Sequence, residues 1–169
     1  EEMLNIVLLE PEMPANTGNI GRTCCATGTR LHLIEPMGFR INDKMLKRAG
    51  LDYWENLDVT VYDCYEDFLE QNPDARQCLY MATTKARQSY AQVQYPENAY
   101  IMFGKESAGI PEEILIEHEK TAIRIPMNEH IRSLNLSNSV AIELYEAVRP
   151  HDFMQMQMEL NLQRLHWKE

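Results

Sequence analysis

Residues 125–139 read Ile-Pro-Met-Asn-Glu-His-Ile-Arg-Ser-Leu-Asn-Leu-Ser-Asn-Ser, and this stretch decides how the chain is interpreted. It joins a predicted strand, 121–125, to a predicted helix, 135–149, on which one apolar stripe is formed by Leu136, Val140, Leu144 and Val148. Five polar side chains crowd residues 133–139, whereas capping a helix uses one or two of them. We therefore expect the others to bind a ligand where the strand ends.

On both sides of this stretch, short apolar runs alternate with helical patterns along most of the chain. Further strands are predicted at 4–9, 31–34, 77–83 and 99–103, and further helices at 16–27, 43–50, 65–71 and 111–118. This alternation indicates an α/β fold, with a mainly parallel sheet flanked by helices. We expect one domain over residues 1–150, followed by a helical tail at 151–169 that packs on the domain or on a dimer partner, because its residues favour helices.

The net charge of −10 disfavours indiscriminate binding to polyanions. Charge is uneven, however, because residues 22–48 hold six basic and two acidic side chains, so a nucleic-acid partner should face that stretch. We see no signal peptide and no membrane-spanning run. The four cysteines lack the spacing of a zinc site, so we expect reduced thiols, no metal and a cytoplasmic location.

Two other loops follow predicted strands, where ligands bind in open α/β sheets. The first, 16–22, contains Gly18, Gly21 and Arg22. The second, 103–111, has the glycine spacing of a phosphate-binding loop, but Ile110 and Pro111 replace the lysine and hydroxyl that such a loop needs, which excludes an NTPase. No dinucleotide-binding glycine motif is present, which disfavours a nicotinamide cofactor.

An ordered set of segments carries a family resemblance. The segments are Leu8–Pro11, Asn16–Ile20, Arg30–Pro36, Gly50–Tyr53, Phe103–Gly104, Arg124–Met127 and Arg132–Asn138. In this order they closely resemble the motifs of the SPOUT methyltransferases, and residues 3–149 resemble the small TrmL (YibK-like) tRNA 2′-O-methyltransferases. Lys105 and Ala108 depart from the usual proline and arginine of that family, a change expected to affect substrate affinity or identity.

The resemblance implies a deep trefoil knot, in which the chain after Ile125 threads through the loop after Thr83. It implies a homodimer that methylates the wobble nucleotide of certain tRNAs with S-adenosylmethionine and releases S-adenosylhomocysteine. The cofactor contacts it implies are Ala82, Thr83, Phe103, Gly104, Ile125, Met127, Ser133, Leu134 and Asn138.

For the chemistry, the ribose hydroxyl has to become nucleophilic. Arginine stays protonated, so we interpret Arg22 as a donor that stabilises the developing alkoxide or holds the adjacent phosphate. Asn135 and Ser137 are expected at the substrate hydroxyl, with Ser133 and Glu106 as further orienting candidates. For Glu106 a structural role stays open, as a helix cap or a contact across a dimer. The expected RNA contacts are Arg22, Lys44, Lys47, Arg48 and Arg132.

Two alternatives stay open on the sequence. The motifs do not name the RNA, so the same chemistry on ribosomal RNA fits them. The altered 104–109 loop also leaves room for a catalytically silent RNA-binding protein of the same fold.

Overall fold

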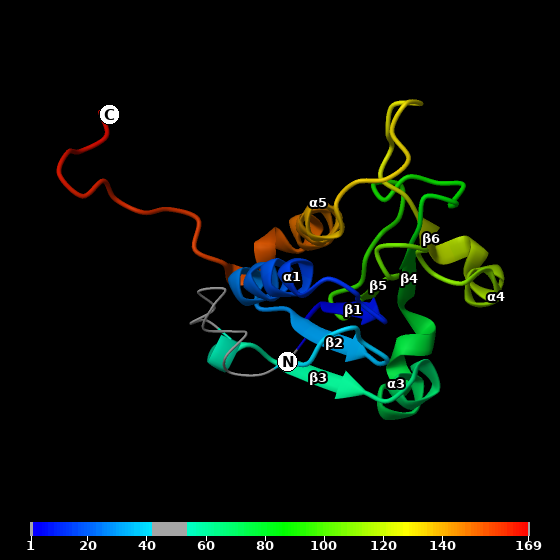
Figure 1. Ribbon diagram of the computed structural model, residues 1–169. Coiled ribbons are helices and arrows are strands. Elements are labelled where there is room, and N and C mark those ends of the chain that lie inside the picture. The colour runs from blue at the N-terminus through cyan, green and yellow to red at the C-terminus, as the bar shows by residue number, and fades with distance from the viewer. Residues whose placement is uncertain (1, 42–53, 169) are drawn as a thin grey trace.

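The computed structural model describes residues 2–41 and 54–168, and its centre is a six-stranded sheet (Figure 1). The strands are β1 (Asn5–Leu9), β2 (Arg30–Ile34), β3 (Val59–Tyr62), β4 (Leu79–Ala82), β5 (Tyr100–Phe103) and β6 (Ala122–Ile123). Their order is β3-β2-β1-β5-β4-β6, and every neighbouring pair is parallel, which confirms the predicted fold class. All five residues of β1 are buried, as expected for a strand covered on both faces.

Helices cover both faces of this sheet (Figure 1). The α-helices are α1 (Pro14–Thr27), α3 (Tyr65–Gln71), α4 (Glu112–Leu115) and α5 (Leu136–Val148), and the 3₁₀ segments are η1 (Trp54–Asn56), η2 (Pro73–Gln77), η3 (Ile116–Thr121) and η4 (Arg149–Gln155). One core cluster joins α1 and α5 to the sheet through Ile20, Val140 and Leu144. A second cluster joins α3 and α4 to the opposite face through Phe68 and Ile114.

The residues at the helix ends explain where most helices begin and end, but the predicted start of α1 was wrong. The α3 helix spans the predicted residues, and Gly28 ends α1 in the left-handed conformation, φ 63°, that glycine adopts without strain. However, α1 begins at Pro14 rather than Asn16, because proline already has the φ of a first helical turn and Met13 before it is extended. The predicted helix at 43–50 lies outside the described residues.

The predicted helix at 111–118 is also shorter and less regular than expected. The α4 helix is one turn long, and η3 continues from it through His118, whose φ and ψ are not helical. The predicted apolar stripe of α5 is confirmed at Val140, Leu144 and Val148, which are fully buried.

The tail is not the helix that its composition predicted. Asp152, Phe153 and Met154 have positive φ values, which break the helical path, and residues 156–168 have no regular secondary structure. Phe153, Met154 and Met156 pack against the core, whereas side chains beyond them, such as Leu160 and Trp167, are exposed. Helix-forming residues alone do not hold a short helix in water, because most of its stability comes from a packed apolar face.

The chain around β6 runs between two parts of the segment that joins β4 to β5. The Thr83 N–H donates to the Ile123 carbonyl at 2.9 Å. On the other side, the Tyr90 N–H donates to the Arg124 carbonyl at 2.8 Å, and the Arg124 N–H donates to the Gln88 carbonyl at 3.1 Å. Residues 123–124 are therefore held on both sides by residues 83–90 before the chain continues to α5.

Two further properties of the described chain concern membrane insertion and the place where a ligand would bind. No helix within residues 2–41 and 54–168 is long and apolar enough to span a membrane. All strands point the same way, so the segments that follow β1, β4, β5 and β6 leave the sheet at one edge. Ligands of open parallel sheets bind at that edge.

Candidate functional site

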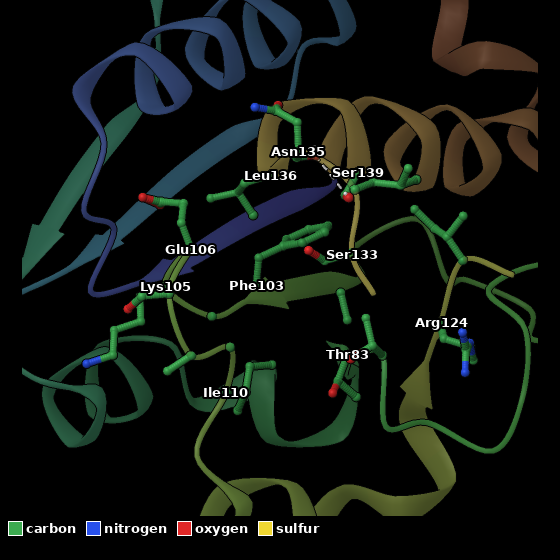
Figure 2. Close-up of a pocket in the computed structure, with 18 of the residues that line it drawn as sticks. Thr83, Phe103, Lys105, Glu106, Ile110, Arg124, Ser133, Asn135, Leu136 and Ser139 are labelled. Carbon is green, nitrogen blue, oxygen red and sulfur yellow. Dashed lines mark hydrogen bonds between the residues drawn. The ribbon is translucent and has the colours of Figure 1, made fainter. Parts of the chain in front are cut away.

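A cavity of about 470 Å³ opens at the carboxyl edge of the sheet (Figure 2). Figure 2 shows side chains from separate segments converging on it: Thr83 after β4, Phe103 at the end of β5, Glu106 in the following loop, and Leu136 on α5. The volume is within the usual range of small-molecule sites. Of the three loops singled out in the sequence, 103–111 and 125–139 therefore meet in space, and 16–22 reaches the cavity through Asn16 alone.

The loop after β5 is closed tightly on itself and forms one wall. The Gly109 N–H donates to the Lys105 carbonyl at 2.8 Å, and Gly109 has a φ of 71°. A Cβ at Gly104 would overlap the carbonyl carbon of Gly109 and the nitrogen of Ile110. Only glycine fits at position 104 without opening the loop.

A reciprocal clasp ties this loop to the segment after β1. The Glu12 N–H donates to the Glu106 carboxylate, at 3.0 and 3.2 Å from its two oxygens, and the Ser107 N–H donates to Glu12 Oε1 at 2.8 Å. Hydrogen bonds from Ser107 lower the pKa of Glu12. Glu106, which the sequence offered as an orienting residue, therefore anchors the loop.

Asn135 ties the start of α5 to α1 on the opposite wall. Its Oδ1 accepts from the Asn138 N–H at 3.2 Å and from the Ser137 hydroxyl at 2.6 Å, and its Nδ2 donates to Asn16 Oδ1 at 3.1 Å. The Ser139 hydroxyl donates to the Asn135 carbonyl at 3.1 Å, the dashed line of Figure 2. Asn135 thus caps α5, and the Ser137 hydroxyl donates to that capping oxygen. The expected place of both residues at the substrate hydroxyl stays a prediction.

Most residues expected at the cofactor line this cavity. They are Ala82, Thr83, Phe103, Gly104, Ile125, Met127, Ser133 and Leu134. Asn138 is absent from the lining, and its N–H faces the cap instead. Backbone and apolar groups predominate in this set, so it suits a neutral, flat ligand part better than a phosphate.

The residues expected at RNA are less closely grouped. Arg22 is exposed on α1 and does not line the cavity, whereas Arg132 is exposed in the loop beside Ser133. Lys44, Lys47 and Arg48 lie outside the described residues. The described structure therefore does not bring the expected substrate contacts together.

Several further residues of the lining were missed by sequence reasoning, among them Asn16, Arg124 and Glu143. Asn16 and Arg124 lie in segments that the motif comparison quoted, so their motif positions were the available signal. Glu143 carries a different signal, because it lies three residues after Val140 and one before Leu144, on the buried side of α5. A charged residue at such a position is rare without a partner.

Charge in the cavity is mixed. Lys85, Lys105 and Arg124 line it together with Glu106 and Glu143, and Lys85 pairs with Glu112 at 3.0 Å. Within the described ranges, no three histidine, cysteine, aspartate or glutamate side chains are grouped so that they could hold a metal ion. The arrangement can bind and orient an organic ligand through backbone groups, apolar walls and a few charged side chains.

Comparisons with known proteins agree with this architecture. The model of the SpoU rRNA methylase family matches residues 3–145. A tRNA (cytidine(34)-2′-O)-methyltransferase of Escherichia coli strain K12 is 52% identical over 149 residues, which are 87% of this chain and 93% of that protein.

Solved structures point the same way. A structure described as giving insight into the 2-OH methylation of C/U34 on tRNA has a TM-score of 0.83 and 41% identity, over 89% of this chain and 97% of that one. An AdoMet-bound rRNA methyltransferase from Sinorhizobium meliloti has a TM-score of 0.76 and 26% identity, over 89% of this chain and 57% of that one.

Proposed function

The chain belongs to the SpoU rRNA methylase family, and from that premise we propose that it transfers a methyl group from S-adenosylmethionine to a ribose 2′-hydroxyl at the wobble nucleotide of tRNA. The observation that carries this proposal is the convergence of the three strand-end segments on one cavity. Relatives named for this reaction match the chain over nearly their whole length.

The cavity fits the cofactor on its own features. Its volume and apolar walls suit a nucleoside, and its lining includes a buried carboxylate oxygen, Glu143 Oε2, that has no hydrogen-bond partner. Ala82, Phe103, Ile125 and Leu134 would hold the cofactor between them. When bound, S-adenosylmethionine supplies an electrophilic methyl on a sulfonium.

The protein's part is to position the acceptor and to stabilise charge. The cofactor, when bound, would give its methyl carbon to the ribose oxygen and leave as S-adenosylhomocysteine, and the adjacent phosphate would accept the hydroxyl proton. Arg22 would donate to the developing alkoxide or to the adjacent phosphate, because a guanidinium cannot act as a base. Holding the two reactants in line replaces several kcal/mol of orientation entropy.

The finer features of the family enter as parts of the same proposal. A trefoil knot is supported by residues 123–124, which lie between Thr83 and Tyr90 before the chain continues to α5. A homodimer is supported by exposed apolar side chains on α5, namely Ile142 and Tyr145. A cytoplasmic location is supported by the cysteines of the described residues, none of which forms a disulfide.

Recognition of tRNA would use Arg132 at the cavity mouth and the basic residues of 22–48, with the phosphate backbone fixing the register. Changing Lys44, Lys47 and Arg48 jointly to alanine should weaken tRNA binding and flatten its salt dependence. Cofactor affinity serves as the control and should not change. An unaltered salt dependence would remove these three residues from the interface.

The reaction is tested by incubating the purified protein with bulk tRNA and methyl-labelled S-adenosylmethionine, then mapping the modified nucleotide. We expect label on a 2′-oxygen at position 34. A parallel incubation with ribosomal RNA tests the substrate named in the family description. Label confined to ribosomal RNA would overturn the tRNA assignment, and no transfer to either RNA would overturn the activity.

A further inference from the structure

The cavity contains one carboxyl that neither the clasp nor the cap uses. Glu143 is 2% exposed, lines the cavity, and has an oxygen, Oε2, without a hydrogen-bond partner. Burying a polar group without a partner costs stability. Because this unpaired carboxyl lowers the stability of the fold, we looked for a ligand group that would pair with it.

The helix places this carboxyl deep in the site. Leu136, Ser139 and Glu143 follow one another at i, i+3 and i+7 along α5, and all three line the cavity. Asn135 at the mouth is exposed, and Glu143 lies eight residues further on, about 12 Å along the helix axis. Its helix neighbours Val140 and Leu144 are fully buried, so this carboxyl lies beside apolar side chains of the core.

Resting on the cofactor assignment made above, we propose that Glu143 recognises the adenine base of the cofactor by pairing with its amino-bearing edge. Adenine places an amino donor beside the ring nitrogen N1, an acceptor. A protonated carboxyl offers the matching acceptor and donor side by side. The apolar surroundings suit a flat aromatic base.

The protonation state supports this pairing at neutral pH. Burial raises the pKa of Glu143 to about 8, so the carboxyl keeps its proton at pH 7. The same ligand has a second group that a carboxyl could bind, the ammonium of its amino-acid end. That group would require the ionised form, so the two pairings predict opposite pH dependence.

Other titratable groups surround the carboxyl and need a control. Tyr80 on β4 and Tyr90 and Tyr95 in the following segment face this region, Glu146 lies on the same helix, and the charged groups of the lining are Lys85, Lys105, Glu106 and Arg124. A Glu143→Gln variant keeps all of them. A difference between its pH profile and that of the unaltered protein therefore isolates Glu143.

The test measures S-adenosylhomocysteine affinity by calorimetry between pH 6.5 and 9, on the full chain. Glu143→Gln keeps a donor and an acceptor, so its affinity at pH 7 should stay within about threefold of the original and should not vary with pH. Glu143→Val removes both groups and should bind about 10-fold to 100-fold more weakly. The unaltered protein should lose about tenfold in affinity between pH 7 and 9.

Glu146→Gln is the matched control, because Glu146 lies on α5 outside the lining and pairs with Arg149. It should leave affinity and its pH profile unchanged. If the valine variant does not fold, the pH profiles of the unaltered protein and of Glu143→Gln still distinguish the adenine pairing from the ammonium pairing.

Three results would overturn the inference. Unchanged affinity in Glu143→Val would show that the carboxyl makes no ligand contact. Affinity that rises from pH 7 to 9 in the unaltered protein, but not in Glu143→Gln, would assign the carboxyl to the ammonium end instead. Absence of any binding by the unaltered protein would overturn the cofactor assignment, and this inference with it.

Discussion

Replacing Gly104 with alanine should damage the cavity more than its small size suggests. The new Cβ would overlap the backbone of Gly109 and Ile110, and backbone cannot rotate away as a side chain can. Relieving the overlap opens the loop and breaks the 2.8 Å hydrogen bond from the Gly109 N–H to the Lys105 carbonyl. Overpacking and one lost hydrogen bond together should cost about 3 kcal/mol of unfolding free energy, or roughly 6–12 °C in Tm.

Two other glycines calibrate that value. Gly109→Ala meets no atom within 4 Å but has to hold a φ of 71°, so it should cost about 1 kcal/mol. Gly38→Ala would approach the Glu12 carbonyl at 3.5 Å, an ordinary contact, and should be neutral. Urea unfolding gives the order of the three, and calorimetry should show S-adenosylmethionine affinity at least about tenfold weaker for Gly104→Ala alone. Equal stability and affinity in the Gly104 and Gly38 variants would refute the steric argument.

Three further predictions concern the walls of the site and the core. Asn135→Ala should lower the unfolding free energy by about 1 kcal/mol through loss of the α5 cap, and Asn135→Ser, which can still cap, should restore most of it in urea titrations. Glu12→Ala should weaken cofactor binding several-fold with little change in Tm, because it frees the Ser107 N–H in an exposed clasp; calorimetry that shows full affinity would contradict this. Burial lowers the pKa of His32 to about 4. The unfolded state therefore takes up a proton below pH 6.5 that the folded state does not bind until about pH 4, so His32 alone should lower the free energy of unfolding by about 3 kcal/mol across that window. Glu143, whose pKa is raised to about 8, acts in the opposite direction. The urea midpoint should therefore fall more steeply toward low pH in Glu143→Gln than in the unaltered protein, and it should rise toward low pH in His32→Gln.

Features that depend on residues close together in the sequence could be predicted from it. The buried positions of α5 follow from helical spacing, and the end of α1 follows from Gly28. The edge strand β3 was missed because Val59, Thr60 and Val61 are partly or fully exposed, so it lacks the continuous apolar run of the central strands. The helix predicted for the tail was wrong for a different reason. Its residues favour a helix, but beyond Met156 its large apolar side chains, such as Leu160 and Trp167, are exposed and gain no packing that would stabilise one.

The clasp and the orphaned carboxyl could not be predicted in the same way. Glu12 and Glu106 are 94 residues apart, and nothing in the spacing of either one indicates the other. Glu143 did carry a signal, a charge on a buried helix face, but the meaning of that signal depends on a cavity formed by segments from four strands.

The segment after β1 therefore has a role that exceeds its contribution to the lining. Glu12 fixes the loop after β5, and Asn16, four residues later, fixes the start of α5 through Asn135. Both movable walls of the cavity are thus held by the first turn of α1 and the loop before it. Because β1 is fully buried and pairs with a strand on each side, this segment leaves a closely packed part of the core. Pre-ordering the walls in this way lowers the entropy cost of binding, so substitutions at residues 12–16 should change affinity even where they touch no ligand.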